Sequence, residues 1–106
     1  MTQAPPSVHM VQGTAIALDG RGVLLLGLPG AGKSELALGL IGEGATLIAD
    51  DLVAVHADEG RIMVAAPRPL RNHMVIRDIG LVPVPQADSA APLAIVIALA
   101  PTPHHG

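Results

Sequence analysis

The sequence contains no phenylalanine, tyrosine or tryptophan among its 106 residues. A core without aromatic rings must be filled by valine, isoleucine, leucine and alanine, which pack in smaller increments. Most proteins that bind single-stranded nucleic acid stack bases on aromatic side chains, and this chain has none to offer. The formal net charge of −3 also supplies no basic field for a phosphate backbone. Nucleic acid is therefore not expected as a partner.

Cysteine is absent as well, which excludes a disulfide framework, a thiolate metal site and a cysteine nucleophile. The longest apolar segments, "GVLLLGLPGAG" and "APLAIVIALA", fall well short of the ~20 residues that span a bilayer. Each is expected to be a buried strand instead. The start "MTQAPPSVHM" has neither the basic residues nor the apolar run of a signal peptide. We expect a cytoplasmic protein with no membrane partner.

Turn and helix signals predict one domain over residues 11–100, between a flexible N-terminus (1–10) and a flexible tail (101–106). Asp19-Gly20 separates two apolar runs and predicts a hairpin. Apolar residues at helical spacing predict a helix from Lys33 that stops at the glycines of "GEG". "ATLIADDLVAVH", a second run "IMVAA" and the final "LAIVIALA" are expected as strands. This order predicts an α/β fold with many strands and few helices.

The stretch "GLPGAGKS" satisfies the P-loop pattern G-x-x-x-x-G-K-[ST] at every fixed position. It also follows a buried strand and precedes a helix, which is the context that the motif requires. Its glycines allow backbone N–H groups to turn toward an anion, and the helix start adds a positive end. A strand-rich, P-loop-containing nucleotide-binding domain is therefore expected. The expected nucleotide-binding residues are Gly27, Leu28, Pro29, Gly30, Ala31, Gly32, Lys33 and Ser34.

A pair of acidic residues, Asp50-Asp51, closes the next apolar run after the helix. In a parallel sheet this strand end would face the same side as the P-loop. Two carboxylates could then divide the work, one holding Mg²⁺ and the other taking a proton from the acceptor. The alternative is a solvated acidic turn, although a charged pair fits poorly into so apolar a strand.

The stretch "DGRGVLLLGLPGAGKSELALGLIGEGATLIADDLVAV" resembles the catalytic domain of the HPr kinase/phosphorylase family, which pairs a P-loop with a downstream Ala-Asp-Asp at this spacing. The resemblance continues through "AAPRPL" and "MVIRDIGLV", the latter similar to the family's Glu-Ile-Arg-Gly-Leu-Gly signature. It extends over residues 11–83. Short family members that lack the N-terminal domain, known from alphaproteobacteria, are the most similar in kind.

This resemblance implies an enzyme that uses ATP and Mg²⁺ to phosphorylate a seryl hydroxyl of HPr, the phosphocarrier of the sugar phosphotransferase system, and that removes the phosphate by phosphorolysis. By position it implies that Lys33 binds the phosphates, and that Ser34 holds Mg²⁺ with Asp50 close to the metal. Asp51 would be the catalytic base, and Arg77 matches the signature's arginine. The family forms hexamers, so a homo-oligomer is left open.

Three departures from the family pattern support a second hypothesis. The family's catalytic histidine falls on Gln12, its metal-binding glutamate falls on Val75, and the chain ends at Gly106 before a further catalytic arginine. Glutamine does not titrate near neutral pH, and valine does not bind Mg²⁺. The alternative function is therefore a catalytically weakened, ATP-binding regulatory domain. His9 is either a substitute for the missing histidine or a solvated terminal residue.

Overall fold

The computed structural model describes residues 7–28, 30–67, 73–76, 80–85 and 90–100. These residues form a strand-rich α/β domain with a single helix among them, so the expected fold class is confirmed. The elements are β1 (Val8–Gln12), β2 (Thr14–Leu18), β3 (Arg21–Gly27), α1 (Lys33–Gly42), β4 (Thr46–Ala49), β5 (Leu52–Asp58), β6 (Arg61–Ala65), β7 (His73–Ile76), β8 (Gly80–Pro83) and β9 (Ala90–Leu99).

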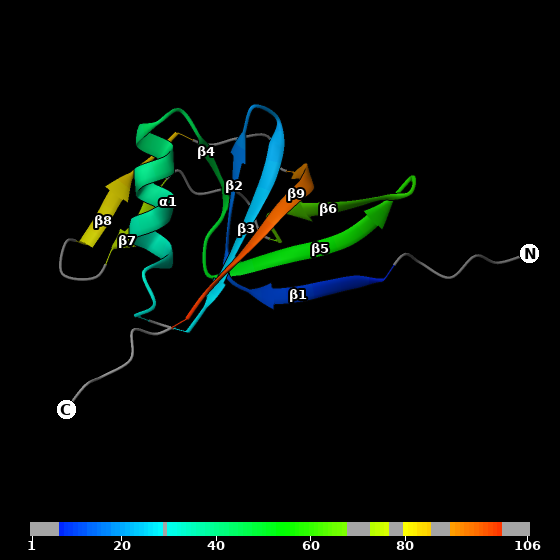
Figure 1. Ribbon diagram of the computed structural model, residues 1–106, viewed down its shortest axis with the longest axis horizontal. Helices are drawn as coiled ribbons and strands as arrows, with labels where there is room; N and C mark the ends of the chain where they lie inside the picture. The colour runs from blue at the N-terminus through cyan, green and yellow to red at the C-terminus, as the bar shows by residue number, and fades with distance from the viewer. Residues whose placement is uncertain (1–6, 29, 68–72, 77–79, 86–89, 101–106) are drawn as a thin grey trace, which may run out of the picture.

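Seven strands form one sheet in the order β1-β5-β6-β9-β3-β2-β4, and β7 pairs with β8 in a separate hairpin (Figure 1). Only the β3–β9 pair is parallel among the described pairs. β9 joins the two parts of the large sheet, because its first residues pair with β6 and its later residues pair with β3. Within the described ranges, no helix is long and apolar enough to cross a membrane.

The predicted hairpin is confirmed, since β2 and β3 are antiparallel and are joined by Asp19 and Gly20. Both residues have positive φ angles, 52° and 75°, as expected for the tight turn that Asp-Gly favours between two strands. β3 is buried from Gly22 to Leu25. It is flanked by β2 and β9, and α1 covers one of its faces.

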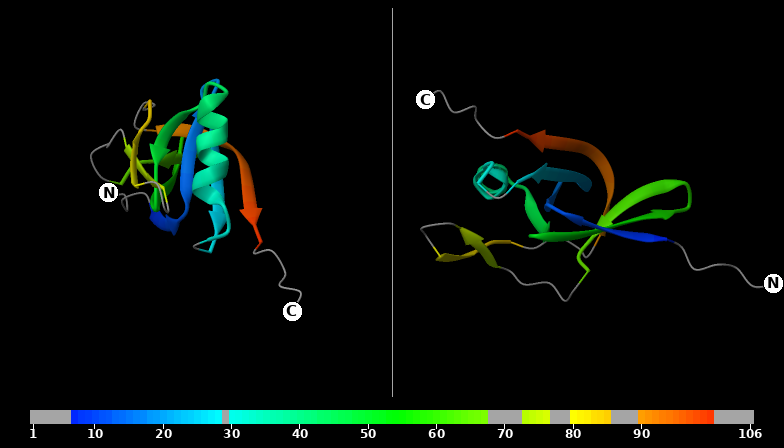
Figure 2. Two further views of the ribbon diagram at one scale, coloured as in Figure 1. Left: turned by 90° about the vertical axis from the view of Figure 1, so that its left-hand side faces the viewer. Right: turned by 90° about the horizontal axis from the view of Figure 1, so that it is seen from below.

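The predicted helix is confirmed as α1, which begins at Lys33 and ends at Gly42. Gly44 follows with a φ of 110°, a conformation that suits glycine after a helix end. The helix is apolar on more than one side because the large sheet lies on one side and the β7–β8 hairpin lies beside it (Figures 1 and 2). Four half-buried residues of α1 pack on the core: Leu36, Leu38, Leu40 and Ile41.

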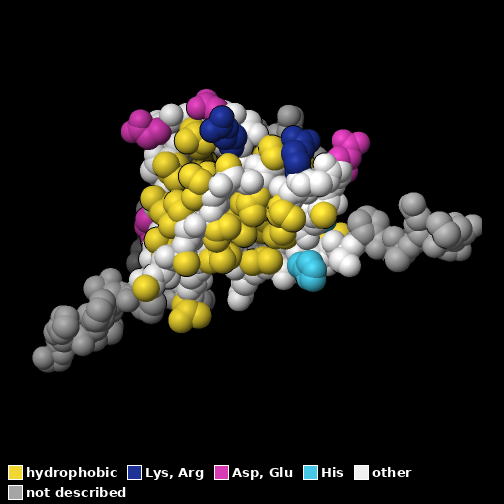
Figure 3. Space-filling model, turned by 45° about the vertical axis from the view of Figure 1, so that its right-hand side comes forward, with side chains coloured by type: hydrophobic (Ala, Val, Ile, Leu, Met, Phe, Trp, Pro, Cys, Tyr) yellow, Lys and Arg dark blue, Asp and Glu magenta, His cyan; other side chains and the backbone are white. Residues whose placement is uncertain are grey.

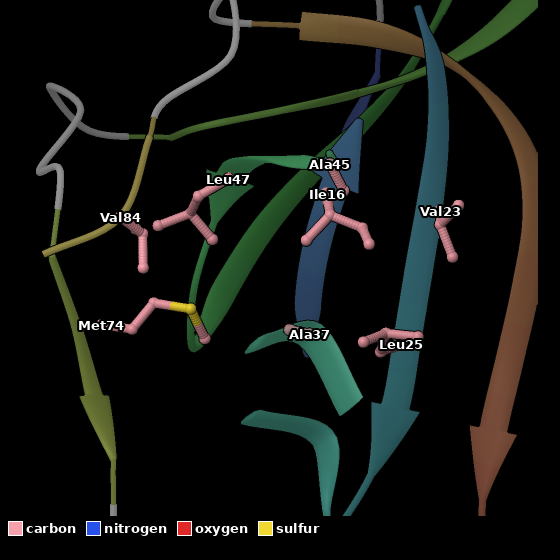
Figure 4. Packing of buried hydrophobic residues seen from close by; sticks show 8 residues of the cluster. All are labelled: Ile16, Val23, Leu25, Ala37, Ala45, Leu47, Met74 and Val84. Atoms are coloured by element: carbon pink, nitrogen blue, oxygen red, sulfur yellow. The ribbon is translucent and has the colours of Figure 1, made fainter. Parts of the chain in front are cut away.

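Aliphatic side chains fill the core in two clusters, as the absence of aromatic rings requires. The cluster beside α1 consists of Ile16, Val23, Leu25, Ala37, Ala45, Leu47, Met74 and Val84 (Figure 4). The cluster on the other face consists of Ala15, Leu24, Ile48, Ala49, Val53, Val64 and Ala91. Neighbouring residues of β2 and of β3 belong to different clusters because successive side chains of a strand point to opposite faces.

The structure differs from the expectations at three places. β1 already begins at Val8, inside the stretch expected to be a flexible terminus, and pairs with β5. The run 45–56 is not one strand, because Asp50 and Asp51 form a bend between β4 and β5. β9 is a strand, but the prediction that it is buried was wrong, since Ile95 and Val96 are half exposed. The expected tail 101–106 lies outside the described residues.

Candidate active site

The glycine-rich loop follows β3 and leads directly into α1 (Figure 1). Gly30 and Gly32 have φ angles of 87° and 99°, which L side chains rarely adopt. A Cβ atom built on Gly27 would lie 2.9 Å from the carbonyl oxygen of Leu99 on β9. The loop therefore needs glycine for two separate reasons, its backbone conformation and its close approach to the neighbouring strand. Pro29, one of the expected nucleotide-binding residues, lies outside the described part of the chain.

The Lys33 side chain folds back over the loop. Its Nζ donates a hydrogen bond to the carbonyl oxygen of Gly27 at 2.6 Å, and the side chain is half buried. Ser34 follows in the first turn of α1 and is also half buried. The first N–H groups of a helix have no partner within the helix, so this turn offers donors and a partial positive charge beside an ammonium group. Such a loop can bind an anion such as a nucleotide phosphate.

The acidic pair lies at the same edge of the sheet as the loop, although the two strands are not neighbours. β3 and β4 both run antiparallel to β2, which lies between them, so they run in the same direction. Their carboxyl ends therefore meet at one edge, with Gly27 on β3 and Asp50 just after β4. Burial raises the pKa of Asp50 above its ordinary value, and the charge of Lys33 is the smallest of the effects that oppose this rise.

Asp50 is held by a side chain that the sequence did not single out. The Thr14 hydroxyl, on a fully buried residue at the start of β2, donates a hydrogen bond to Asp50 Oδ1 at 2.9 Å. No spacing rule could have linked these residues, which are 36 positions apart. Burial raises the pKa of Asp50 above its ordinary value of 3.8, because desolvation outweighs the hydrogen bonds from Thr14 and from the Asp51 backbone. The carboxyl is thus fixed in direction and costly to ionise.

Asp51 has a different environment from its neighbour. It is exposed, and its φ of 76° is unusual for a residue other than glycine. The Asp51 carbonyl oxygen accepts a hydrogen bond from the Gly13 N–H at 3.0 Å, which ties the bend to the β1–β2 connection. One carboxyl group of the pair is therefore half buried, and the other faces solvent. This asymmetry suits the division into a metal-side group and an acceptor-side group.

The structure places two of the residues that depart from the family pattern, Gln12 and Val75. Gln12 is exposed at the end of β1 and pairs with Leu52, the residue after Asp51. His9 also lies on β1, but three positions earlier, so its side chain points to the opposite face of the strand from Gln12. In this register His9 does not replace the missing histidine. Val75 lies on β7, and Arg77 lies outside the described residues.

Among the described residues, protein side chains alone do not form a closed metal site. Within the described ranges, no three His, Asp or Glu side chains gather in a way that could hold a metal ion. Mg²⁺ commonly keeps several waters and binds one or two protein groups together with substrate phosphates. The Ser34 hydroxyl at the helix start and the Asp50 carboxylate are of the right chemical kind for that mode.

The fold and the glycine-rich loop define a strand-rich α/β domain of the P-loop nucleotide-binding type. A family model described as the HPr Serine kinase C-terminal domain matches residues 5–91. The chain belongs to this family. One solved structure that it resembles, the Hpr(Ser) kinase/phosphatase from Coxiella burnetii, superposes with a TM-score of 0.75 at 25% identity, over 85% of this chain and 58% of that one.

Curated relatives carry the same family name. The HPr kinase/phosphorylase of Lactobacillus acidophilus is 47% identical over 77 residues, which are 72% of this chain and 24% of that protein. The HPr kinase/phosphorylase of Shouchella clausii is 40% identical over 78 residues, which are 73% of this chain and 25% of the relative. The chain therefore spans about a quarter of the length of the curated relatives it matches.

Proposed function

We propose that this domain binds ATP with Mg²⁺ and transfers the terminal phosphate to a seryl hydroxyl of an HPr-like phosphocarrier, with phosphorolysis as the reverse activity. The observation that carries the proposal is the meeting of the glycine-rich loop and the acidic pair at one edge of the sheet. Membership of the HPr Serine kinase family supports the choice of acceptor. The reaction would take place in the cytoplasm, where ATP and phosphocarriers of sugar uptake are present.

The loop residues would hold the nucleotide. Backbone N–H groups from Gly30 to Ser34 would surround the phosphates, and the Lys33 ammonium would exchange its present partner, the Gly27 carbonyl, for phosphate oxygens. Ser34 and Asp50 would hold Mg²⁺, which supplies charge neutralisation on the phosphates. Thr14 would keep the Asp50 carboxylate turned in one direction through its hydrogen bond.

Asp51 would act as the general base. Its carboxylate is exposed and so can be approached by a serine on the surface of another protein. It would take the seryl proton while the seryl oxygen forms a bond to the terminal phosphorus and the bond to the leaving ADP oxygen breaks. In the reverse reaction the protonated Asp51 would return the proton to the serine oxygen as phosphate accepts the phosphoryl group.

A weakened, ATP-binding regulatory domain is the second candidate. Gln12 pairs with Leu52, the residue that follows Asp51, and so lies close to the acidic pair. Glutamine does not titrate near neutral pH. If this position normally assists proton transfer, the chain would bind ATP without turning it over. The two candidates share the nucleotide site and differ only in the chemistry.

Two measurements on the purified chain test both steps. Calorimetry with Mg²⁺-ATP should show binding that weakens by at least ~10-fold in Lys33→Ala, because this variant lacks a charge-assisted phosphate contact. Glu35→Ala, an exposed change in the same first turn of α1, serves as the matched control and should bind nearly as wild type. Equal affinity of wild type and Lys33→Ala would contradict the nucleotide site.

Incubation with labelled ATP, Mg²⁺ and HPr-like phosphocarriers then separates the two candidates. Label on a seryl residue of the carrier supports the kinase. Intact ATP binding without label transfer to any carrier contradicts the kinase and supports the regulatory domain.

A further inference from the structure

Two segments that are far apart in the sequence run side by side through the acidic pair. β1 pairs antiparallel with β5, and β2 pairs antiparallel with β4. The last pair of β1 with β5 and the first pair of β2 with β4 are separated by two residues on each segment, so the register continues between them without an insertion. Gly13 therefore lies opposite Asp51, and Thr14 lies opposite Asp50.

Each acidic residue is bound by the residue opposite it, but through a different group. The Gly13 N–H donates a hydrogen bond to the Asp51 carbonyl oxygen at 3.0 Å, and the Thr14 hydroxyl donates one to Asp50 Oδ1 at 2.9 Å. Asp51 has a φ of 76°, and a residue other than glycine keeps such a conformation where its surroundings hold it there. The bond from the Gly13 N–H supplies such a hold on the Asp51 backbone.

Gly13 also touches the strand that leads into the glycine-rich loop. A Cβ atom built on Gly13 would lie 2.6 Å from the carbonyl oxygen of Leu25 and 3.1 Å from Leu26 Cδ2, both on β3. The φ angle of Gly13 lies outside the left-handed range, so glycine is required here by close approach and not by backbone conformation. The Gly13 backbone therefore sets how closely Asp51 lies to β3, the strand that ends at Gly27 in the loop.

The two neighbours of Gly13 differ in their freedom to move. β3 is flanked by β2 and β9 and is buried from Gly22 to Leu25, so its carbonyl groups have little room to shift. Asp51 is exposed and lies at the bend between β4 and β5. A side chain at position 13 is therefore expected to displace the acidic bend and to leave the glycine-rich loop in place.

We propose that Gly13 is a positioning residue, which holds Asp51 at a fixed distance from the glycine-rich loop through its N–H group and through its lack of a side chain. Thr14 holds Asp50 from the next position, so consecutive residues of the β1–β2 connection align both carboxyl groups. The consequence for catalysis rests on the proposed phosphotransfer, in which Asp51 accepts the seryl proton. A displacement of a reacting group by about 1 Å lowers a rate on the order of 10²-fold.

Gly13→Ala should lower the rate of serine phosphorylation at saturating Mg²⁺-ATP on the order of 10²-fold, with an affinity for Mg²⁺-ATP close to that of the wild type. Gly22→Ala is the matched control, because a Cβ atom there would also lie 2.6 Å from a neighbour, Val64 Cγ2, but near the start of β3. It should lose stability without losing rate. Figure 3 shows a continuous patch of hydrophobic side chains on one face, through which loosened variants could associate, so sedimentation beside the wild type controls for particle size.

Two measurements without nucleotide test the positioning by itself. In two-dimensional N–H spectra, Gly13→Ala should shift the signals of Asp51 and Leu52 more than those of Gly30 to Ser34, because the bend moves and the loop does not. In the wild type, the Gly13 N–H should exchange slowly with solvent, since it is buried and hydrogen-bonded. The exchange measurement remains decisive if the variant does not fold.

The outcomes separate this proposal from the proposed function. If the wild type transfers phosphate to no carrier, the kinase proposal fails, and the spectra and the amide exchange alone decide the positioning. Fast exchange of the Gly13 N–H, or unshifted Asp51 signals in Gly13→Ala, overturns the proposal. An unchanged rate in Gly13→Ala despite shifted signals, or an equal loss of rate in Gly22→Ala, overturns it as well.

Discussion

Asp50 and Asp51 are adjacent in the chain but differ in their surroundings. Asp50 is half buried and accepts a hydrogen bond from the Thr14 hydroxyl, and burial raises its pKa. Asp51 is exposed at a bend. Among the described residues Thr14 is a buried polar residue, and its hydroxyl donates its hydrogen bond to Asp50. The two carboxyl groups are therefore expected to respond differently to substitution.

Asp50→Asn should stabilise the fold increasingly as pH rises. The pKa of Asp50 is raised in the folded state above the ordinary 3.8. At pH values between the unfolded-state pKa and the folded-state pKa, the folded protein therefore binds more protons than the unfolded chain. Stability from this group is then present at low pH and is lost as pH rises through the folded pKa. Asparagine removes this loss and still accepts the Thr14 hydrogen bond. Denaturant unfolding should show an advantage of the variant that grows from acid pH and then levels off; a constant difference would contradict the burial of an ionising group.

Asp51→Asn should abolish phosphorylation and phosphorolysis while leaving nucleotide binding largely intact. The base acts on the acceptor hydroxyl and does not contact the loop, and general-base contributions of ~10²–10⁴-fold are typical. Asp50→Asn should instead weaken Mg²⁺-dependent binding more than the proton step. Phosphotransfer rates at saturating ATP, measured beside calorimetric affinities, distinguish the two. Equal rate losses with equal affinity losses in both variants would argue against the division of roles.

At the scale of elements, glycine residues have different roles in the glycine-rich loop and in α1. Gly27 has no room for a side chain beside Leu99, whereas Gly39, in the exposed part of α1, has no atom within 4 Å of a Cβ position. The two glycines are therefore opposite cases. One is required by packing, and the other only weakens a helix.

Gly39→Ala should raise the free energy of unfolding by about 0.5–1 kcal/mol, since alanine restricts the unfolded chain and favours a helix interior. Gly27→Ala should lower it and weaken ATP binding, because the new Cβ would press on the Leu99 carbonyl at 2.9 Å. Urea titrations of both variants, with ATP affinity as a second measurement, check the contrast. Stabilisation by Gly27→Ala would show that the close approach between loop and β9 is not a constraint.

At the scale of the whole molecule, nucleotide binding should stabilise the folded domain. A ligand that binds only the folded state adds about 2.7 kcal/mol to the free energy of unfolding at a concentration 100-fold above its Kd. Thermal unfolding with Mg²⁺-ATP should therefore shift upward for the wild type and much less for Lys33→Ala at the same ligand concentration. An equal shift in both proteins would mean that the stabilising site is not the glycine-rich loop.

The sequence by itself determined the local features of this protein. The Asp19-Gly20 turn, the glycine-rich loop and the start of α1 at Lys33 were all predicted where the structure has them. Each depends on neighbouring residues and on backbone preferences of glycine, which are readable from a short stretch. The strand-rich α/β class followed from the order of these features.

Only the tertiary structure decided how distant segments meet. It inserted β2 between β3 and β4 and still brought Asp50 to the edge of the loop, and it joined Thr14 to Asp50 across 36 positions. It also left the apolar Ile95 and Val96 half exposed, although their run predicted a buried strand. Burial depends on which elements cover a strand, and no periodicity within the strand itself records that.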